Sequence, residues 1–272
     1  MMQCGNWPIG VCSWSLQRDV PGVVEAMRQL GIENVSLAVR PAVEDVSGAV
    51  LKSMQQQDWN IYSTMIDFPQ EDYSTMDAIK VTGGIAPDDC WERNRDLFLG
   101  AVGVTVALGV KYLTMHAGFI DHSDEAYVRK FYKRLRTLAD AAGNKQITLL
   151  LETGQETAEE LREFLETLNH PAVAVNFDPA NIILYGKGEP KEAVKVLAKW
   201  IKHIHVKDAL PTETQGTWGA EVPWGDGKVE SDQFLTILRE LGFDGVLGIE
   251  REAGDDRIGD IKLAAQRLSQ FK

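Results

Sequence analysis

Short apolar runs alternate with longer amphipathic segments from one end of the chain to the other. Eight of these runs are apolar enough to be covered on both faces, as the strands of a parallel sheet are. The predicted strands are Ile9–Trp14, Asn34–Val39, Ile61–Ile66, Tyr112–His116, Ile147–Glu152, Val173–Asp178, Ile201–Lys207 and Val246–Glu250. The predicted helices cover residues 20–30, 45–57, 91–108, 124–142, 157–168, 190–199, 231–241 and 256–270.

Several of these helices carry recognisable end signals. Ser123 and Asp124 precede one helix and are expected to cap it, and Thr157 with Glu160 has the spacing of a capping box. Glycines at 31, 143 and 242 are expected just past helix ends, where a left-handed residue commonly stops a helix.

The regular alternation predicts an α/β fold, a (β/α)8 TIM barrel that forms one domain over residues 1–272. A length of 272 residues is close to the roughly 250 residues typical of such a barrel. A Rossmann fold is disfavoured because no Gly-x-Gly-x-x-Gly sequence follows a predicted strand. Two longer insertions, at about 67–90 and 209–230, follow strands at the rim where such barrels carry their sites, so both loops are expected to cover a substrate.

Composition narrows the classes of partner. With 28 basic and 40 acidic side chains the net charge is -12, which repels a phosphate backbone and argues against nucleic acid. The three cysteines, Cys4, Cys12 and Cys90, show no Cys-x-x-Cys spacing, so we expect no disulfide framework and a cytoplasmic, reducing location. The N-terminal residues show no secretory signal, and the apolar run Leu97–Val110 is too short to span a membrane.

Four consecutive predicted strands carry an acidic or imidazole side chain at or near their C-terminal end. These residues are Glu152, Asp178, His205 and Glu250. The carboxyl ends of parallel strands share one rim, where ligands bind, so the four side chains are expected to meet there. Three carboxylates and one imidazole suit one hard or borderline divalent cation and do not suit a structural zinc site built from thiolates. Mn²⁺ is the expected ion, with Mg²⁺, Co²⁺ and Zn²⁺ as alternatives.

The same segments resemble the xylose isomerase-like TIM barrel superfamily, in particular its sugar phosphate isomerase/epimerase group. The resemblance spans nearly the whole chain and is strongest in LLETG at 150–154, NFDPAN at 176–181, HIHVKDA at 203–209 and GIERE at 248–252. It implies that Glu152, Asp178, His205 and Glu250 bind the metal. It also implies a small carbohydrate substrate.

The chemistry that the resemblance implies can be explained by the charge of the metal ion and of the glutamates. A divalent cation that chelates a hydroxyl and an adjacent carbonyl stabilises a metal-bound enediolate after a proton leaves carbon. Glu152 and Glu250 are expected to be the catalytic acid and base, one removing the proton and the other returning it. The predicted function is therefore a metal-dependent sugar isomerase or epimerase. A lyase or dehydratase that acts on keto-inositols or 3-keto-glycosides at the same site stays open, as does a homo-oligomeric state.

Five further residues are candidates for contact with the substrate: His116, Asn181, Lys207, Trp14 and Trp224. Asn181 stands where epimerases of this group usually carry a histidine, and no arginine closely follows His205. Both departures weaken an assignment to the tagatose- or allulose-type epimerases. Because no glycine-rich phosphate loop or arginine cluster is apparent, a substrate without phosphate is favoured. His203 is expected to pack one layer below His205, and Arg251 is expected to form an ion pair outside the barrel.

Overall fold

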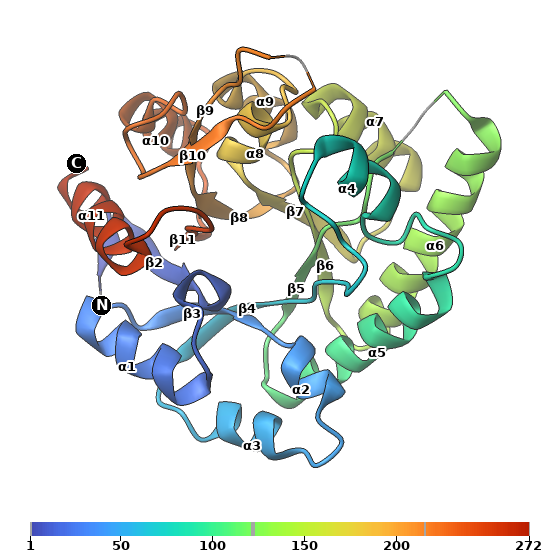
Figure 1. Cartoon of the computed structure of the whole chain (residues 1–272), viewed down its shortest axis with the longest axis horizontal. Helices are drawn as coiled ribbons and strands as arrows, with labels where there is room; N and C mark the ends of the chain where they lie inside the picture. The colour runs from blue at the N-terminus through green and yellow to red at the C-terminus, as the bar shows by residue number, and fades with distance from the viewer. Residues whose placement is uncertain (1, 121–122, 215, 272) are drawn as a thin grey trace.

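The computed structural model describes residues 2–120, 123–214 and 216–271. Within these residues, eight parallel strands form a closed barrel with helices around it (Figure 1). The strands are β2 (Trp7–Cys12), β3 (Asn34–Ala38), β4 (Asn60–Met65), β5 (Tyr112–Met115), β6 (Thr148–Glu152), β7 (Val173–Phe177), β8 (Ile201–Val206) and β11 (Val246–Ile249). Pairing of β2 with β3 closes the ring, so the predicted (β/α)8 TIM barrel is confirmed.

The remaining elements lie outside the ring or at its ends. The helices are α1 (Val20–Leu30), α2 (Arg40–Glu44), α3 (Ala49–Gln55), α4 (Met76–Thr82), α5 (Trp91–Ala107), α6 (Glu125–Gly143), α7 (Ala158–Leu168), α8 (Pro179–Leu184), α9 (Pro190–Leu197), α10 (Ser231–Glu240) and α11 (Arg257–Gln270), with a 3-10 turn, η1 (Ser13–Leu16). Short strand β1 (Gln3–Cys4) pairs with β2, and β9 (Asp208–Leu210) pairs with β10 (Ala220–Val222). No helix in the described part of the chain is both long and apolar enough to cross a membrane.

Several boundaries differ from the sequence expectation, and three of the differences bear on the elements named above. The helix predicted over 45–57 is the shorter α3, and an unpredicted helix, α2, precedes it. Asp45 accepts hydrogen bonds from the Ser47 and Val50 amides, which form a turn between the two helices and delay the start of α3. The first strand ends at Cys12, so Trp14 lies in η1. Gly143 is the last residue of α6 and does not follow it.

The predicted caps of two helices are confirmed. The Asp124 carboxylate accepts hydrogen bonds from the backbone amides of Ala126 and Tyr127 at the start of α6. Thr157 and Glu160 form the capping box of α7.

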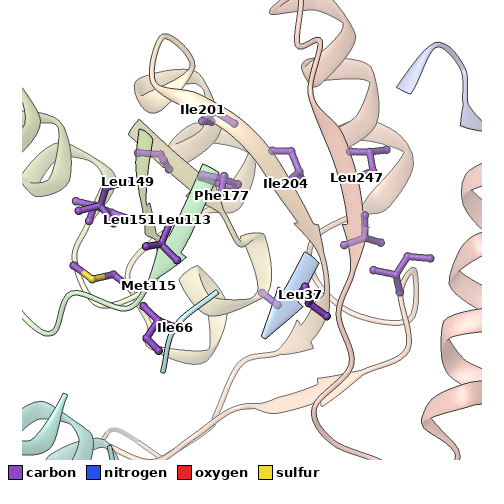
Figure 2. Packing of buried hydrophobic residues seen from close by; sticks show 14 of the residues in the cluster. Leu37, Ile66, Leu113, Met115, Leu149, Leu151, Phe177, Ile201, Ile204 and Leu247 are labelled. Atoms are coloured by element: carbon purple, nitrogen blue, oxygen red, sulfur yellow. The ribbon is translucent and has the colours of Figure 1, made fainter. Parts of the chain in front are cut away.

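The apolar core fills the layer between the barrel and its helices. Successive side chains of a strand point to opposite faces, so Leu149 and Leu151 of β6 face the helices while Leu150 and Glu152 face the barrel axis. Figure 2 shows this layer, in which Leu113, Leu149, Leu151, Phe177, Ile204 and Leu247 belong to one buried cluster. Side chains on the opposite faces of the strands point to the barrel axis, and polar groups are placed there.

A layer of rings fills the barrel axis below the predicted site. His203 packs edge-on against Tyr62 and Tyr112, with ring centroids 5.0 Å and 4.8 Å apart. Gly10 and Gly248 make room for Tyr62, since a Cβ at these positions would lie 2.6 Å from its Cε1 and 2.0 Å from its hydroxyl oxygen. Burial lowers the pKa of His203 to about 3, so this ring is neutral and packs as predicted.

One buried carboxylate holds the loop after β8 in place through hydrogen bonds. Asp208 accepts hydrogen bonds from the backbone amides of Ala209, Gly225, Gly227 and Val229. These bonds draw residues 223–229 against the end of the barrel, while the β9–β10 hairpin extends from it.

Candidate active site

The four predicted ligand residues converge at the carboxyl ends of their strands. One ligand atom from each of Glu152, Asp178, His205 and Glu250 lies within 4.8 Å of the others. His205 Nδ1 is 3.1 Å from Glu152 Oε1, 3.3 Å from Glu250 Oε2 and 3.8 Å from Asp178 Oδ2. At most 3% of any of these four side chains is exposed. We call this group the carboxylate–histidine cluster.

Local structure holds the members of the cluster in position. Asp178 caps α8, because its Oδ1 accepts a hydrogen bond from the Asn181 amide at 3.0 Å. The Thr153 hydroxyl bonds both the amide and the carbonyl of Asp178, which ties β6 to β7. Asn176 Nδ2 lies 3.0 Å from His205 Nε2 and leaves Nδ1 directed at the carboxylates.

The cluster holds buried charges whose pKa values shift together. Burial alone would raise the pKa of Glu152 and Glu250, but the nearby histidines, and Lys207 beside Glu250, outweigh burial and lower both values. Burial raises the pKa of Asp178 to about 6 despite Lys207. Burial would lower the pKa of His205, yet Glu250 and its neighbours raise it well above its ordinary value. The cluster thus stabilises positive charge between its carboxylates.

The donor set fits a divalent cation. Glu152 Oε2, Asp178 Oδ2 and Glu250 Oε2 are buried and accept no hydrogen bond from the described residues, although cationic side chains lie at ion-pair distance. Buried carboxylate oxygens without hydrogen bonds are costly unless a cation binds them. Three such oxygens beside one imidazole nitrogen match the preference of Mn²⁺, Mg²⁺ or Co²⁺.

Lys207 is buried next to the cluster. Its Nζ lies 2.9 Å from Glu250 Oε2, 3.6 Å from Asp178 Oδ2 and 2.5 Å from Glu252 Oε2. The sequence reasoning did not select Glu252. Its position two residues after Glu250 was the available signal, because both residues follow β11 at the rim of the barrel.

A cavity of about 810 Å³ opens above the cluster. Trp14, His116, Asn181 and Lys207, four of the five predicted substrate contacts, line it together with Glu250. Both predicted covering loops contribute to its wall, as do several residues that sequence reasoning left unused, namely Asp67, Glu71, Tyr73, Tyr185, Trp218, Glu221 and Glu252.

Three of the cavity residues hydrogen-bond or pair with the two glutamates. Trp14 Nε1 donates to Glu250 Oε1 at 2.6 Å, and Asn181 Nδ2 donates to Glu152 Oε1 at 3.3 Å. His116 Nε2 lies 3.4 Å from Glu152 Oε2. Each glutamate therefore has one oxygen held by neighbours and one oxygen without a hydrogen bond.

The prediction that Trp224 contacts the substrate does not agree with its position. Among the described residues, those that line the cavity do not include Trp224, which is buried against Phe234 with ring centroids 6.4 Å apart. The hydrogen bonds from the Gly225 and Gly227 amides to Asp208 explain this, because they turn the segment inward. Arg251 pairs with Glu221 and Asp260 at 2.7 Å and 2.8 Å, as expected.

A profile of the family described as xylose isomerase-like TIM barrel matches residues 23–271. The chain belongs to this family. The crystal structure of a xylose isomerase domain protein from Planctomyces limnophilus has a TM-score of 0.86 and 28% sequence identity, with 98% of this chain and 96% of that chain covered. The family membership agrees with the fold and with the resemblance found in the sequence.

The curated proteins that match this sequence include a putative epimerase and inosose dehydratases. A putative L-ribulose-5-phosphate 3-epimerase of Haemophilus influenzae is 25% identical over 58% of this chain and 58% of its own length. An inosose dehydratase of Clostridium botulinum is 25% identical over 43% of this chain and 45% of its own length. The matched region spans only about half the length of these relatives.

Proposed function

We propose that this protein is a metal-dependent isomerase or epimerase of a monosaccharide or sugar derivative. The observation that carries the proposal is the carboxylate–histidine cluster, which places three buried oxygens without hydrogen bonds and one imidazole around a common point beneath a cavity. The family relation supports a sugar as substrate, since its relatives include a putative sugar-phosphate epimerase and inosose dehydratases.

Glu152, Asp178, His205 and Glu250 would hold the ion, with Mn²⁺ as the first candidate. When bound, a divalent cation would polarise a substrate carbonyl and so acidify the neighbouring C–H. Lys207, which lines the cavity, is placed to donate a hydrogen bond to a substrate oxygen.

Glu152 and Glu250 are proposed as the proton-transfer pair. Glu152 ends β6 and Glu250 follows β11, and the two strands are separated in the sheet by β7 and β8. Glu250 lines the cavity, and Glu152 contacts His116 and Asn181, which also line it. Their lowered pKa values keep both ionised and able to accept a proton. Trp14 orients one carboxylate and Asn181 the other through the hydrogen bonds already described.

A dehydratase is the second candidate function. The same base that starts an epimerisation would start a β-elimination if the substrate carried a hydroxyl on the next carbon, and inosose dehydratases are among the relatives. A screen of keto-sugars, keto-inositols and 3-keto-glycosides in deuterated water separates the two. An isomerase or epimerase retains the substrate mass apart from deuterium, whereas a dehydratase loses the mass of water.

The glutamate pair is tested by substitution with glutamine. Glu152→Gln and Glu250→Gln retain size and one oxygen donor but remove the basic group, and general acid–base catalysis contributes about 10²–10⁴-fold. We expect turnover to fall by at least that order in samples whose Mn²⁺ content equals that of the wild type. Near wild-type exchange of the substrate proton by either metal-loaded variant would show that the substituted glutamate is not the base.

The cavity favours a substrate without phosphate. Its cationic lining residues Arg40 and Lys207 already pair with carboxylates, Arg40 with Asp67 at 3.0 Å and Lys207 with Glu250 and Glu252. A phosphate would have to compete with these partners for charge-assisted hydrogen bonds. We therefore expect an uncharged sugar to bind better than its phosphate ester.

A further inference from the structure

The outer part of the cavity carries aromatic side chains that the proposed proton transfers do not use. Tyr73, Tyr185 and Trp218 line the cavity together with Glu250 of the cluster, and we call these three the aromatic collar. They come from three separate segments, namely the loop between β4 and α4, the end of α8 and the loop between β9 and β10. Both long insertions therefore contribute a ring to one wall.

Specific contacts hold the collar together. Trp218 Nε1 donates a hydrogen bond to the Tyr73 carbonyl at 3.1 Å, and its ring packs edge-on against Tyr185 with centroids 4.9 Å apart. Gly219 lets the β9–β10 hairpin fold closely, because a Cβ there would lie 2.3 Å from the Leu210 carbonyl oxygen. Tyr73 stays 43% exposed, so the collar presents aromatic surface at the cavity mouth.

The size and charge of the cavity indicate what this surface binds. A volume of about 810 Å³ is in the upper part of the range of roughly 300–1,000 Å³ that suits drug-sized ligands, and one sugar ring placed at the cluster fills only its inner part. The cations Arg40 and Lys207 are already paired, so the outer part favours an uncharged group. Aromatic faces pack well against sugar rings and aryl groups.

We infer that the substrate is an uncharged glycoside, with its reacting sugar ring at the carboxylate–histidine cluster and a second ring or aryl aglycone against the aromatic collar. This inference rests on the proposed function, because that function places the reacting ring. Trp218 is then a residue that determines specificity for the aglycone and takes no part in proton transfer.

The test is a binding comparison that involves no turnover. Methyl and phenyl β-D-glucopyranoside share one sugar ring and differ only in the aglycone, and neither carries a carbonyl. Isothermal titration of each glycoside into the Mg²⁺-loaded protein should give about tenfold tighter binding of the phenyl glycoside, which corresponds to the usual gain from one aromatic contact. Trp218→Ala should remove this preference, and Trp218→Phe should retain most of it.

Trp200→Ala supplies the matched control. Trp200 is also a half-buried tryptophan, but it precedes β8 and so lies at the opposite end of the barrel from the cavity. This variant should keep the tenfold preference. Equal affinity of the wild type for the two glycosides, no binding of the phenyl glycoside up to its solubility limit, or an equal loss in Trp218→Ala and Trp200→Ala would each overturn the inference. Deuterium exchange into keto-sugars tests the proposed function separately.

Discussion

Substituting Gly248 by alanine tests how the barrel axis supports the cluster. Gly248 is two residues before Glu250 and pairs with His205 in the sheet, and the added Cβ would lie 2.0 Å from the Tyr62 hydroxyl oxygen and 3.1 Å from Tyr62 Cζ. The Tyr62 ring packs edge-on against His203 with centroids 5.0 Å apart, so a shift of the tyrosine ring away from the new methyl group would disturb this contact. Overpacking of this kind costs about 1–3 kcal/mol.

Tyr62→Phe should rescue most of this loss. The Tyr62 hydroxyl is buried without a hydrogen-bond partner among the described residues, so its removal alone should be close to neutral. In the double variant the new methyl group faces the ring carbon in place of the oxygen, and a coupling energy of about 1 kcal/mol or more is expected. The assay is urea denaturation of the metal-free protein in EDTA for the wild type, both single variants and the double variant.

Gly103→Ala is the matched control for the cycle. Gly103 lies inside α5, and a Cβ added there would have no atom from outside the helix backbone within 4 Å, so alanine should stabilise the helix by roughly 0.5–1 kcal/mol. The packing account would be refuted if Gly248→Ala left stability unchanged. It would also be refuted if the stability loss of the double variant equalled the sum of the losses of the two single variants.

Three further predictions concern buried charge. Lys207→Met removes the cation that neighbours Glu250 and Asp178, so the free energy of unfolding of the metal-free protein in urea should fall by about 3–5 kcal/mol. Saturating Mn²⁺ should restore much of this stability. An equal loss with and without Mn²⁺ would contradict the prediction. Burial raises the pKa of Glu156 to about 7 from 4.5, so the stability of the wild type should fall as pH rises through this interval. Glu156→Gln should therefore be more stable than the wild type by up to about 3 kcal/mol at pH 8 and nearly equal to it at pH 4.5. A stability difference independent of pH would exclude the buried carboxyl as its cause. Asp208→Ala leaves the Gly225, Gly227 and Val229 amides without their acceptor. Limited proteolysis should therefore cut the 209–230 loop faster in this variant than in the wild type. An unchanged cleavage rate would show that other contacts hold the loop.

The parts of the site that follow strand periodicity could be predicted from the sequence. Glu152, Asp178, His205 and Glu250 each lie within one residue of the carboxyl end of a barrel strand, so the fold alone brings them to one rim. The inward direction of His203 and Lys207 follows from their spacing of two from His205.

The parts that depend on loop conformation or tertiary packing could not be predicted. Trp224 is in the core because the Asp208 carboxylate gathers amides from distant residues, and nothing in the local sequence signals those bonds. The aromatic collar brings Tyr73 against rings that follow it by more than a hundred positions, which hydrophobic periodicity does not detect. The late start of α3 in the 45–57 segment depends on the Asp45 turn, whose hydrogen bonds the apolar pattern of the segment does not show.

The most direct test of the account is the metal content of the protein and of two cluster variants. After reconstitution with Mn²⁺ and removal of free ion, elemental analysis should find one ion per wild-type chain and strong loss in Asp178→Ala and His205→Ala. Asp67→Ala, which removes a carboxylate that lines the same cavity outside the cluster, should keep the ion. Full occupancy in both cluster variants would contradict the assignment of the metal site.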